Sequence, residues 1–157
     1  MNSVLRFIQV FALGTWVGSI IYLSFVVAPG AFGVLQSRDQ AGLMVGYSLA
    51  RLHYIGMVAA VLYLVAGLAL GPALKTLVQP AMLGVILMLG LTFVSQTRVT
   101  PRLTELRTEM VSVDATPQGN PLRVEFDRLH RTSVRIEVVV LLIGIAAVFL
   151  TVRSAGK

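Results

Sequence analysis

Charged residues divide the sequence into four long apolar runs. Residues 7–37, 52–74, 76–97 and 138–152 contain no Asp, Glu, Lys or Arg. A helix needs roughly 20 residues to cross a hydrocarbon core of about 30 Å, because each residue advances it by about 1.5 Å. The first three runs reach that length. The fourth reaches it only if its helix begins earlier, near Arg131, and draws Arg135 and Glu137 towards the membrane.

Helix-breaking and capping residues indicate where these helices begin and end. Pro29-Gly30 ends the first helix, and Gly71-Pro72 ends the second. Ser37, with Gln40 three residues later, has the spacing of a capping box. The expected helices span about 7–28, 38–70, 80–110 and 121–153. Together they predict an all-α, integral membrane four-helix bundle that forms a single domain over residues 1–157.

The helix over 80–110 and the one over 121–153 extend beyond their apolar runs. Helical spacing of apolar residues continues past Pro101, so we expect a kink there and a helix that continues into water. Residues 111–119 read as a loop, and Asn120-Pro121 read as the cap and first turn of the last helix.

Composition agrees with a membrane protein. Hydrophobic residues make up 56% of the chain and charged residues 13%, about half the share typical of a soluble domain. The net charge of +6 comes from basic residues at the ends of apolar runs, so it indicates membrane topology and not a nucleic-acid partner. The first run is too long for a signal peptide. The absence of Cys excludes disulfides and thiolate chemistry.

The distribution of Lys and Arg predicts the orientation. The segments after the first and third helices hold nine basic residues, whereas the termini and the central loop hold four. The positive-inside rule then places both termini outside the cytoplasm. All seven acidic residues lie on the side with nine, but the rule counts only Lys and Arg. The compact, Arg-rich and Cys-free chain favours a bacterial inner membrane.

A short internal repeat allows two interpretations. Arg51-Leu52-His53 and Arg128-Leu129-His130 are the same tripeptide, and each precedes an apolar run. Val27-Ala28-Pro29 and Val99-Thr100-Pro101 occupy matching places upstream. A duplication would give two parallel helical hairpins related by an axis along the membrane normal. The alternative is coincidence in a sequence rich in Arg and Leu.

Small residues indicate where helices approach closely. Gly14 and Gly18 have the spacing that lets two membrane helices touch. Gly56, Ala60 and Gly67 form a similar stripe on the second helix. We interpret both stripes as helix-packing faces, and Gly14 and Gly18 as the contact with a second copy if that face is left open.

Glu137 is the acidic residue drawn into a membrane segment. His130, Ser133 and Glu137 share one face of the last helix and form a candidate polar site. An unpaired carboxylate there costs on the order of 2–3 kcal/mol, so Glu137 is expected to pair or to bind a proton. Arg51 and Arg98 are the expected partners for a structural ion pair. The functional alternative is a proton- or cation-coupled site.

Two histidines raise a second possibility. His53 and His130, with Met57 one turn after His53, offer a copper site, and two His can clamp a haem iron. The competing interpretation is that each His satisfies a helix end near the headgroups. The chain has no nucleophile–base set, paired metal-binding helix motif or phosphate loop, so an enzyme is not expected.

Three segments resemble a known family. They are residues 27–32 (VAPGAF), residues 41–47 (AGLMVGY) and residues 126–133 (FDRLHRTS). The pattern is similar to that of the transmembrane protein 205-like family of small four-helix membrane proteins. This resemblance implies a membrane location, and a relative associated with platinum-drug resistance implies transport or trafficking. Glu137 stands where the family commonly has Asn. A looser similarity to the membrane domain of copper-resistance proteins agrees with the copper alternative.

The sequence therefore predicts a small polytopic membrane protein that is transport-related or an accessory factor of a membrane complex. The alternative is a copper- or haem-binding membrane protein that uses His53 and His130. The expected partners are the lipid bilayer and either a second copy or another membrane protein.

Overall fold

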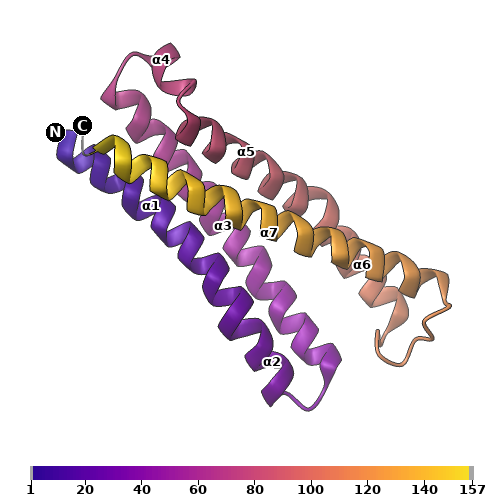
Figure 1. Ribbon diagram of the computed structural model, residues 1–157. Coiled ribbons are helices and arrows are strands. Elements are labelled where there is room, and N and C mark those ends of the chain that lie inside the picture. Colours follow the sequence, from indigo (N-terminus) through magenta and orange to yellow (C-terminus); the bar gives the residue numbers. More distant parts are fainter. Residues whose placement is uncertain (1, 156–157) are drawn as a thin grey trace.

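Four long helical segments pack side by side along most of their length (Figure 1). The computed structural model describes residues 2–155, which contain no strand. The segments Asn2–Val34, Arg38–Leu70, Pro80–Met110 and Pro121–Ser154 are each long and apolar enough to cross a membrane. The predicted all-α four-helix membrane bundle is confirmed.

Within the described residues, eight helical elements build the segments and a ninth lies between two of them. The first contains α1 (Asn2–Tyr22), the π-helical η1 (Leu23–Val27) and α2 (Ala28–Val34). The second is α3 (Arg38–Leu70), followed by the short α4 (Ala73–Leu77). The third contains α5 (Pro80–Val94), the π-helical η2 (Ser95–Val99) and α6 (Thr100–Met110), and the fourth is α7 (Pro121–Ala155).

Successive segments are antiparallel neighbours, and the last packs against the first. α1 contacts α3, α3 contacts α5, α5 contacts α7, and α7 contacts α1. The two chain ends and α4 lie at one end of the bundle (Figure 1). The turn between α2 and α3 and the loop between α6 and α7 lie at the opposite end. There the hairpin formed by the first two segments splays apart from the hairpin formed by the last two.

The first segment is longer than expected, because Pro29 does not end it. We expected the helix to stop at residue 28, but α2 continues to Val34. In a regular helix the Pro29 ring would clash with the carbonyl of residue 25. The wider π-helical turn of η1 precedes it, and the Ala28 N–H donates to the Leu23 carbonyl five residues back. The same arrangement, with Thr100 N–H donating to Ser95, accommodates Pro101 in the third segment.

Local capping follows the sequence. The Ser37 side chain accepts a hydrogen bond from Gln40 N–H at 3.3 Å and begins α3. Asn120 Oδ1 accepts from Leu122 N–H at 2.9 Å and begins α7. The connection between α3 and α5, residues 71–79, contains α4, which the sequence did not lead us to expect.

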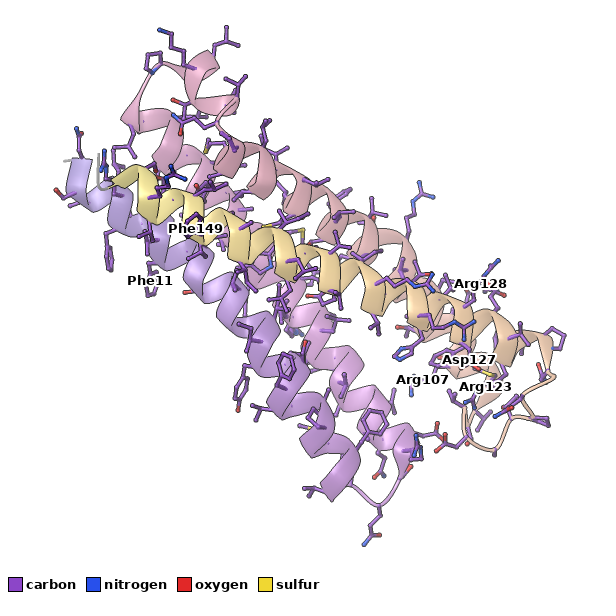
Figure 2. The ribbon with its side chains drawn as sticks, in the orientation of Figure 1. Phe11, Arg107, Arg123, Asp127, Arg128 and Phe149 are labelled. Carbon is purple, nitrogen blue, oxygen red and sulfur yellow. The ribbon has the colours of Figure 1, made fainter. Side chains whose placement is uncertain are left out.

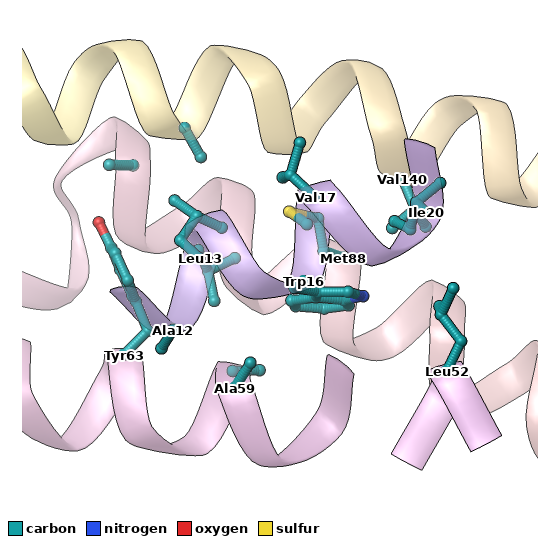
Figure 3. Packing of buried hydrophobic residues seen from close by; sticks show 14 of the residues in the cluster. Ala12, Leu13, Trp16, Val17, Ile20, Leu52, Ala59, Tyr63, Met88 and Val140 are labelled. Atoms are coloured by element: carbon teal, nitrogen blue, oxygen red, sulfur yellow. The ribbon is translucent and has the colours of Figure 1, made fainter. Parts of the chain in front are cut away.

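The main core contains large apolar side chains from all four segments (Figure 3). Trp16 and Leu13 of α1, Met88 of α5 and Val140 of α7 are almost completely buried. The indole ring of Trp16 packs directly against Gly56 of α3, and a Cβ at this position would overlap the ring. Ala60 is fully buried, and a Cβ at Gly67 would lie 2.8 Å from Gln9 Nε2. This stripe of α3 therefore packs inside the bundle.

Gly14 and Gly18 lie elsewhere. A Cβ at either position would meet no atom within 4 Å, and both residues are exposed on the outside of α1. The space above both glycines is therefore open within this chain, and the predicted contact with a second copy stays a prediction.

A second, smaller core joins α6 to the first half of α7. It is formed by Leu106, Val113 and Phe126, with partly buried apolar neighbours. Arg102 forms two hydrogen bonds with the Glu125 carboxylate, at 2.9 and 3.0 Å. Charged side chains such as Arg107, Arg123 and Asp127 gather at this end, whereas Phe11 and Phe149 lie at the other (Figure 2). The end that bears the loops is therefore charged.

Asp39 ties the loop between α6 and α7 to the start of α3. Its carboxylate accepts from Ser112 Oγ at 2.6 Å and from Val113 N–H at 3.0 Å. Arg107 donates to the Asp39 carbonyl at 3.3 Å. These contacts connect the two hairpins where they splay apart.

Candidate functional site

Three helices bring polar side chains together inside the bundle. His53 of α3 is fully buried, and its Nδ1 lies 2.8 Å from Gln96 Oε1 of η2. Its Nε2 lies 3.3 Å from Glu137 Oε2 of α7. The Glu137 side chain is 14% exposed, so it connects the buried ring to the outer surface. His53, Gln96 and Glu137 form what we term the polar site.

The hydrogen bonds imply that the histidine and the glutamate share a proton. Gln96 Oε1 is an acceptor, so His53 Nδ1 carries a hydrogen and donates to it. Nε2 then bonds to Glu137 in one of two ways: a charged ring donates to a carboxylate, or a carboxylic acid donates to a neutral ring. Both forms hold one proton between Nε2 and Oε2. The pair is therefore neutral overall, which reduces the cost of burying it.

The polar site lies near one edge of the apolar slab. His53 precedes Leu70 by 17 residues, Glu137 precedes Arg153 by 16, and Gln96 follows Pro80 by 16. At about 1.5 Å per residue, each lies about 24–26 Å from the end of the bundle that bears the termini. All three residues are thus at one level, close to the charged end.

Three arginines lie on the outer surface of the bundle at the level of the polar site. Arg51, Arg98 and Arg135 are exposed, and each stands two residues from a member of the polar site. Residues two apart point to roughly opposite faces of a helix, so the arginines point outward where the site residues point inward. Long Arg side chains placed in this way reach the headgroups.

The expected pairing of Glu137 with Arg51 or Arg98 is wrong. Glu137 pairs with His53, because its side chain points into the bundle while the arginines point out. Arg51 instead lies over the Tyr47 ring, 5.0 Å from its centroid. The partner of Glu137 is thus a ring that can gain or lose a proton and not a permanent cation.

His130 is separate from the polar site. It lies seven residues before Glu137, or about 10 Å along α7. Its ring is exposed and stacks on Phe126, with centroids 6.2 Å apart. Ser133 is buried on α7 between them. The predicted stripe of His130, Ser133 and Glu137 is therefore not one site.

The residues proposed as metal ligands also do not lie close together. His53 uses both ring nitrogens within the polar site, while His130 stacks on Phe126. Met57 is only partly buried. Among the described residues no three His, Asp or Glu side chains are grouped as metal ligands.

Sequence reasoning missed Gln96 and its neighbour Ser95. Ser95 is fully buried, and its Oγ has no hydrogen-bond partner within the described part of the chain. Trp16 Nε1 is also buried without a partner. The available signal was the polar pair Ser95-Gln96 at the end of an otherwise apolar run, just before Pro101.

The two hairpins correspond in structure but not at the site. η1 and η2 are both five residues long and begin 72 residues apart, as do Pro29 and Pro101. His53 and His130 are 77 residues apart. With the same separation, Ala60 of the first hairpin corresponds to Glu137 of the second. The first hairpin therefore supplies the buried histidine, and the second supplies the carboxylate.

Comparison with known proteins identifies a family by its sequence pattern. The model of a domain of unknown function, DUF4149, matches residues 11–112, about two thirds of the chain. The matched part includes His53 and Gln96 and ends before Glu137. No curated protein and no solved structure matches the chain. The resemblance to the transmembrane protein 205-like family is not tested by this match and stays a prediction.

Proposed function

We infer the function from the premise that the chain belongs to the DUF4149 family, and that its four apolar helices make it a multi-pass membrane protein. We propose that it is transport-related and that the His53–Glu137 pair takes up and releases a proton as the coupled step. The alternative within the same proposal is an accessory factor of a membrane complex, in which the pair makes the complex responsive to pH.

The observation that carries this proposal is the hydrogen bond between the buried His53 ring and the Glu137 carboxylate, at 3.3 Å. Ionisable residues inside a membrane segment are costly and mark proton or ion pathways. An Arg partner would favour a purely structural ion pair, because Arg stays charged at every relevant pH. A histidine ring can hold one or two protons, so this pair is suited to exchange a proton.

The surroundings of the pair support access from one side. Glu137 is partly exposed near the charged end, whereas His53 is fully enclosed. Towards the other end, Leu13, Met88 and Val140 form an apolar layer. Beyond that layer, Tyr63 Oη and Thr151 Oγ1 form a second buried polar contact at 2.7 Å. Passage across the membrane therefore requires the apolar layer to open.

Location and partners complete the proposal. Nine basic residues at the charged end favour a cytoplasmic position for it, with both termini outside and the protein in a bacterial inner membrane. Four helices are few for a lone transporter, so we expect a homo-oligomer or another membrane protein as partner. The proposed role is not enzymatic. The copper or haem alternative has no observation in its favour, because His53 and His130 lie apart.

Proton movement in liposomes tests the proposal. Purified protein is reconstituted with an internal pH dye, and a membrane potential is imposed with a potassium gradient and valinomycin. We expect the wild type to move protons, and Glu137→Gln and His53→Gln to reduce the rate to that of empty liposomes. His130→Gln is the matched control and should keep the wild-type rate. Equal rates in the wild type and Glu137→Gln would overturn the proposal.

A second readout separates loss of function from loss of folding. The His130→Gln variant contains one histidine, so the NMR signals of labelled histidine report His53 alone. We expect the Nε2 chemical shift of this ring to change when Glu137→Gln is added, because the bond to the carboxylate is lost, while the protein still elutes as a single species. An identical Nε2 chemical shift in both backgrounds would contradict the shared proton.

A further inference from the structure

An open groove lies on the outer surface between the first segment and α3. It has a volume of about 610 Å³, which is within the range of small-molecule sites. Its lining includes Gly14, Gly18, Tyr22, Tyr47, Arg51 and Ile55. The two glycines leave the floor uncovered, since a Cβ at either would meet no atom within 4 Å.

The groove runs along the membrane normal from an apolar end to a charged end. Trp16 packs against Gly56, and this contact places Ile55 beside the Gly14–Gly18 part of the groove. Because α1 and α3 are antiparallel, Tyr47 lies towards the Val27 end. Gly14 and Val27 are 13 residues apart, or about 20 Å along a helix. In the register set by the Trp16–Gly56 contact, Arg51 lies level with residue 21, so this length covers a headgroup and the adjoining part of an acyl chain.

Arg51 supplies the one charged group that lines this groove. It is exposed, and its guanidinium lies 5.0 Å from the centre of the Tyr47 ring. No carboxylate among residues 2–155 lies within ion-pair distance of it. It stands two residues on the charged side of His53, at the level where headgroups begin. The groove therefore combines an apolar floor with an unneutralised cation at headgroup depth.

We propose that this groove binds one phospholipid with an anionic headgroup. The acyl chain lies over Gly14 and Gly18, and the phosphate contacts Arg51. Basic pockets between membrane helices bind anionic headgroups in this way, and the cytoplasmic leaflet is rich in them. A second copy of the chain fits less well, because two copies of this face would bring two Arg51 side chains together without a carboxylate from the groove.

Native mass spectrometry of the detergent-purified full chain tests the proposal. Phosphatidylglycerol and phosphatidylcholine with identical acyl chains are added separately, and the bound fractions are compared. We expect about fivefold tighter binding of phosphatidylglycerol, corresponding to about 1 kcal/mol for one basic residue. Arg51→Gln should abolish this preference. Arg98→Gln, at the same level on another segment and also exposed, is the matched control and should preserve it.

A second pair of variants tests the apolar floor. Gly14→Leu with Gly18→Leu fills the groove, so binding of both lipids should fall. Gly90→Leu is the control, because Gly90 is also exposed with no atom near its Cβ position but lies outside the groove. Equal binding of the two lipids by the wild type would overturn the proposal, as would an equal loss in Arg98→Gln. A double leucine variant that changes from dimer to monomer and keeps its lipid would identify the groove as an interface between copies.

Discussion

At the residue scale, His53 and His130 follow the same two residues in the chain but have different surroundings. His53 lies on the inward face of α3, where η2 and α7 bring Gln96 and Glu137 to its ring. His130 lies seven residues before Glu137 on α7, where its exposed ring stacks on Phe126 of the same helix. Their different roles follow from position in the bundle and not from local sequence.

Gly56 gives a prediction at the same scale. Gly56→Ala should destabilise the protein by about 1–3 kcal/mol, because the new methyl group overlaps the Trp16 indole ring. The measurement is thermal unfolding in detergent, followed by Trp16 fluorescence, since Trp16 is the one Trp in the chain.

The control for Gly56 is Gly46→Ala on the same helix. Gly46 has no atom within 4 Å of its Cβ position, so the substitution should leave the melting temperature unchanged or raise it, as Ala is favoured over Gly in helices by up to about 1 kcal/mol. Equal melting temperatures for the two variants would show that Trp16 can move aside freely.

At the element scale, the π-helical turns are the unexpected feature. Each ends two residues before a proline, and each lets a long helix continue where a break or kink is usual. η2 also carries Ser95 and Gln96, so the segment that accommodates Pro101 contributes to the polar site. π-helical turns are frequent at functional sites, which agrees with this placement.

Asp39 gives a prediction for the loop between α6 and α7. Asp39→Ala removes the acceptor for Ser112 Oγ and Val113 N–H, so this loop should separate from α3. Limited proteolysis of the purified protein should then cut within residues 111–120 faster than in the wild type.

The matched control is Asp114→Ala in the same loop. Asp114 forms an ion pair with Arg38 at 3.6 Å, but both side chains are largely exposed, and such pairs contribute only about 0–1 kcal/mol. Its cleavage rate should remain close to wild type. If both variants were cleaved at the wild-type rate, the Asp39 contacts would not be what holds the loop.

At the scale of the whole molecule, the bundle has two unlike ends. One bears both chain ends and the short α4, and the other bears the charged extension of α6 and α7 (Figure 1, Figure 2). Exposed Arg51, Arg98 and Arg135 lie between the apolar slab and this extension. That arrangement agrees with a membrane boundary at their level, with the charged end in the cytoplasm.

Reporter fusions test this orientation. A periplasmic phosphatase fused after Lys157 should be active, and a fluorescent protein fused there should stay dark, because the C-terminus is predicted outside the cytoplasm. The complementary control inserts the same reporters at Ala115 in the loop between α6 and α7, where the phosphatase should be inactive. An inactive phosphatase after Lys157 would reverse the orientation.

The sequence by itself determined the helices and most of their ends. Runs without charge predicted four membrane segments, and Ser37 and Asn120 marked caps that the structure contains. These features are local: a cap needs the next few residues, and a membrane span needs only length and apolarity. For the same reason His53 and Glu137 were recognised as unusual, since a polar residue in an apolar run is visible without knowing its neighbours.

The tertiary structure decided which residues meet. It paired Glu137 with His53 and not with Arg51 or Arg98, and it added Gln96 to the same site. It also packed Trp16 against Gly56, whereas Gly14 and Gly18 remained uncovered. In water, apolar residues mark the inward face of a helix, but in lipid both faces are apolar, so the pattern does not say which one is buried. The direction of each helix face therefore depends on packing among all four segments, which no single stretch of sequence contains.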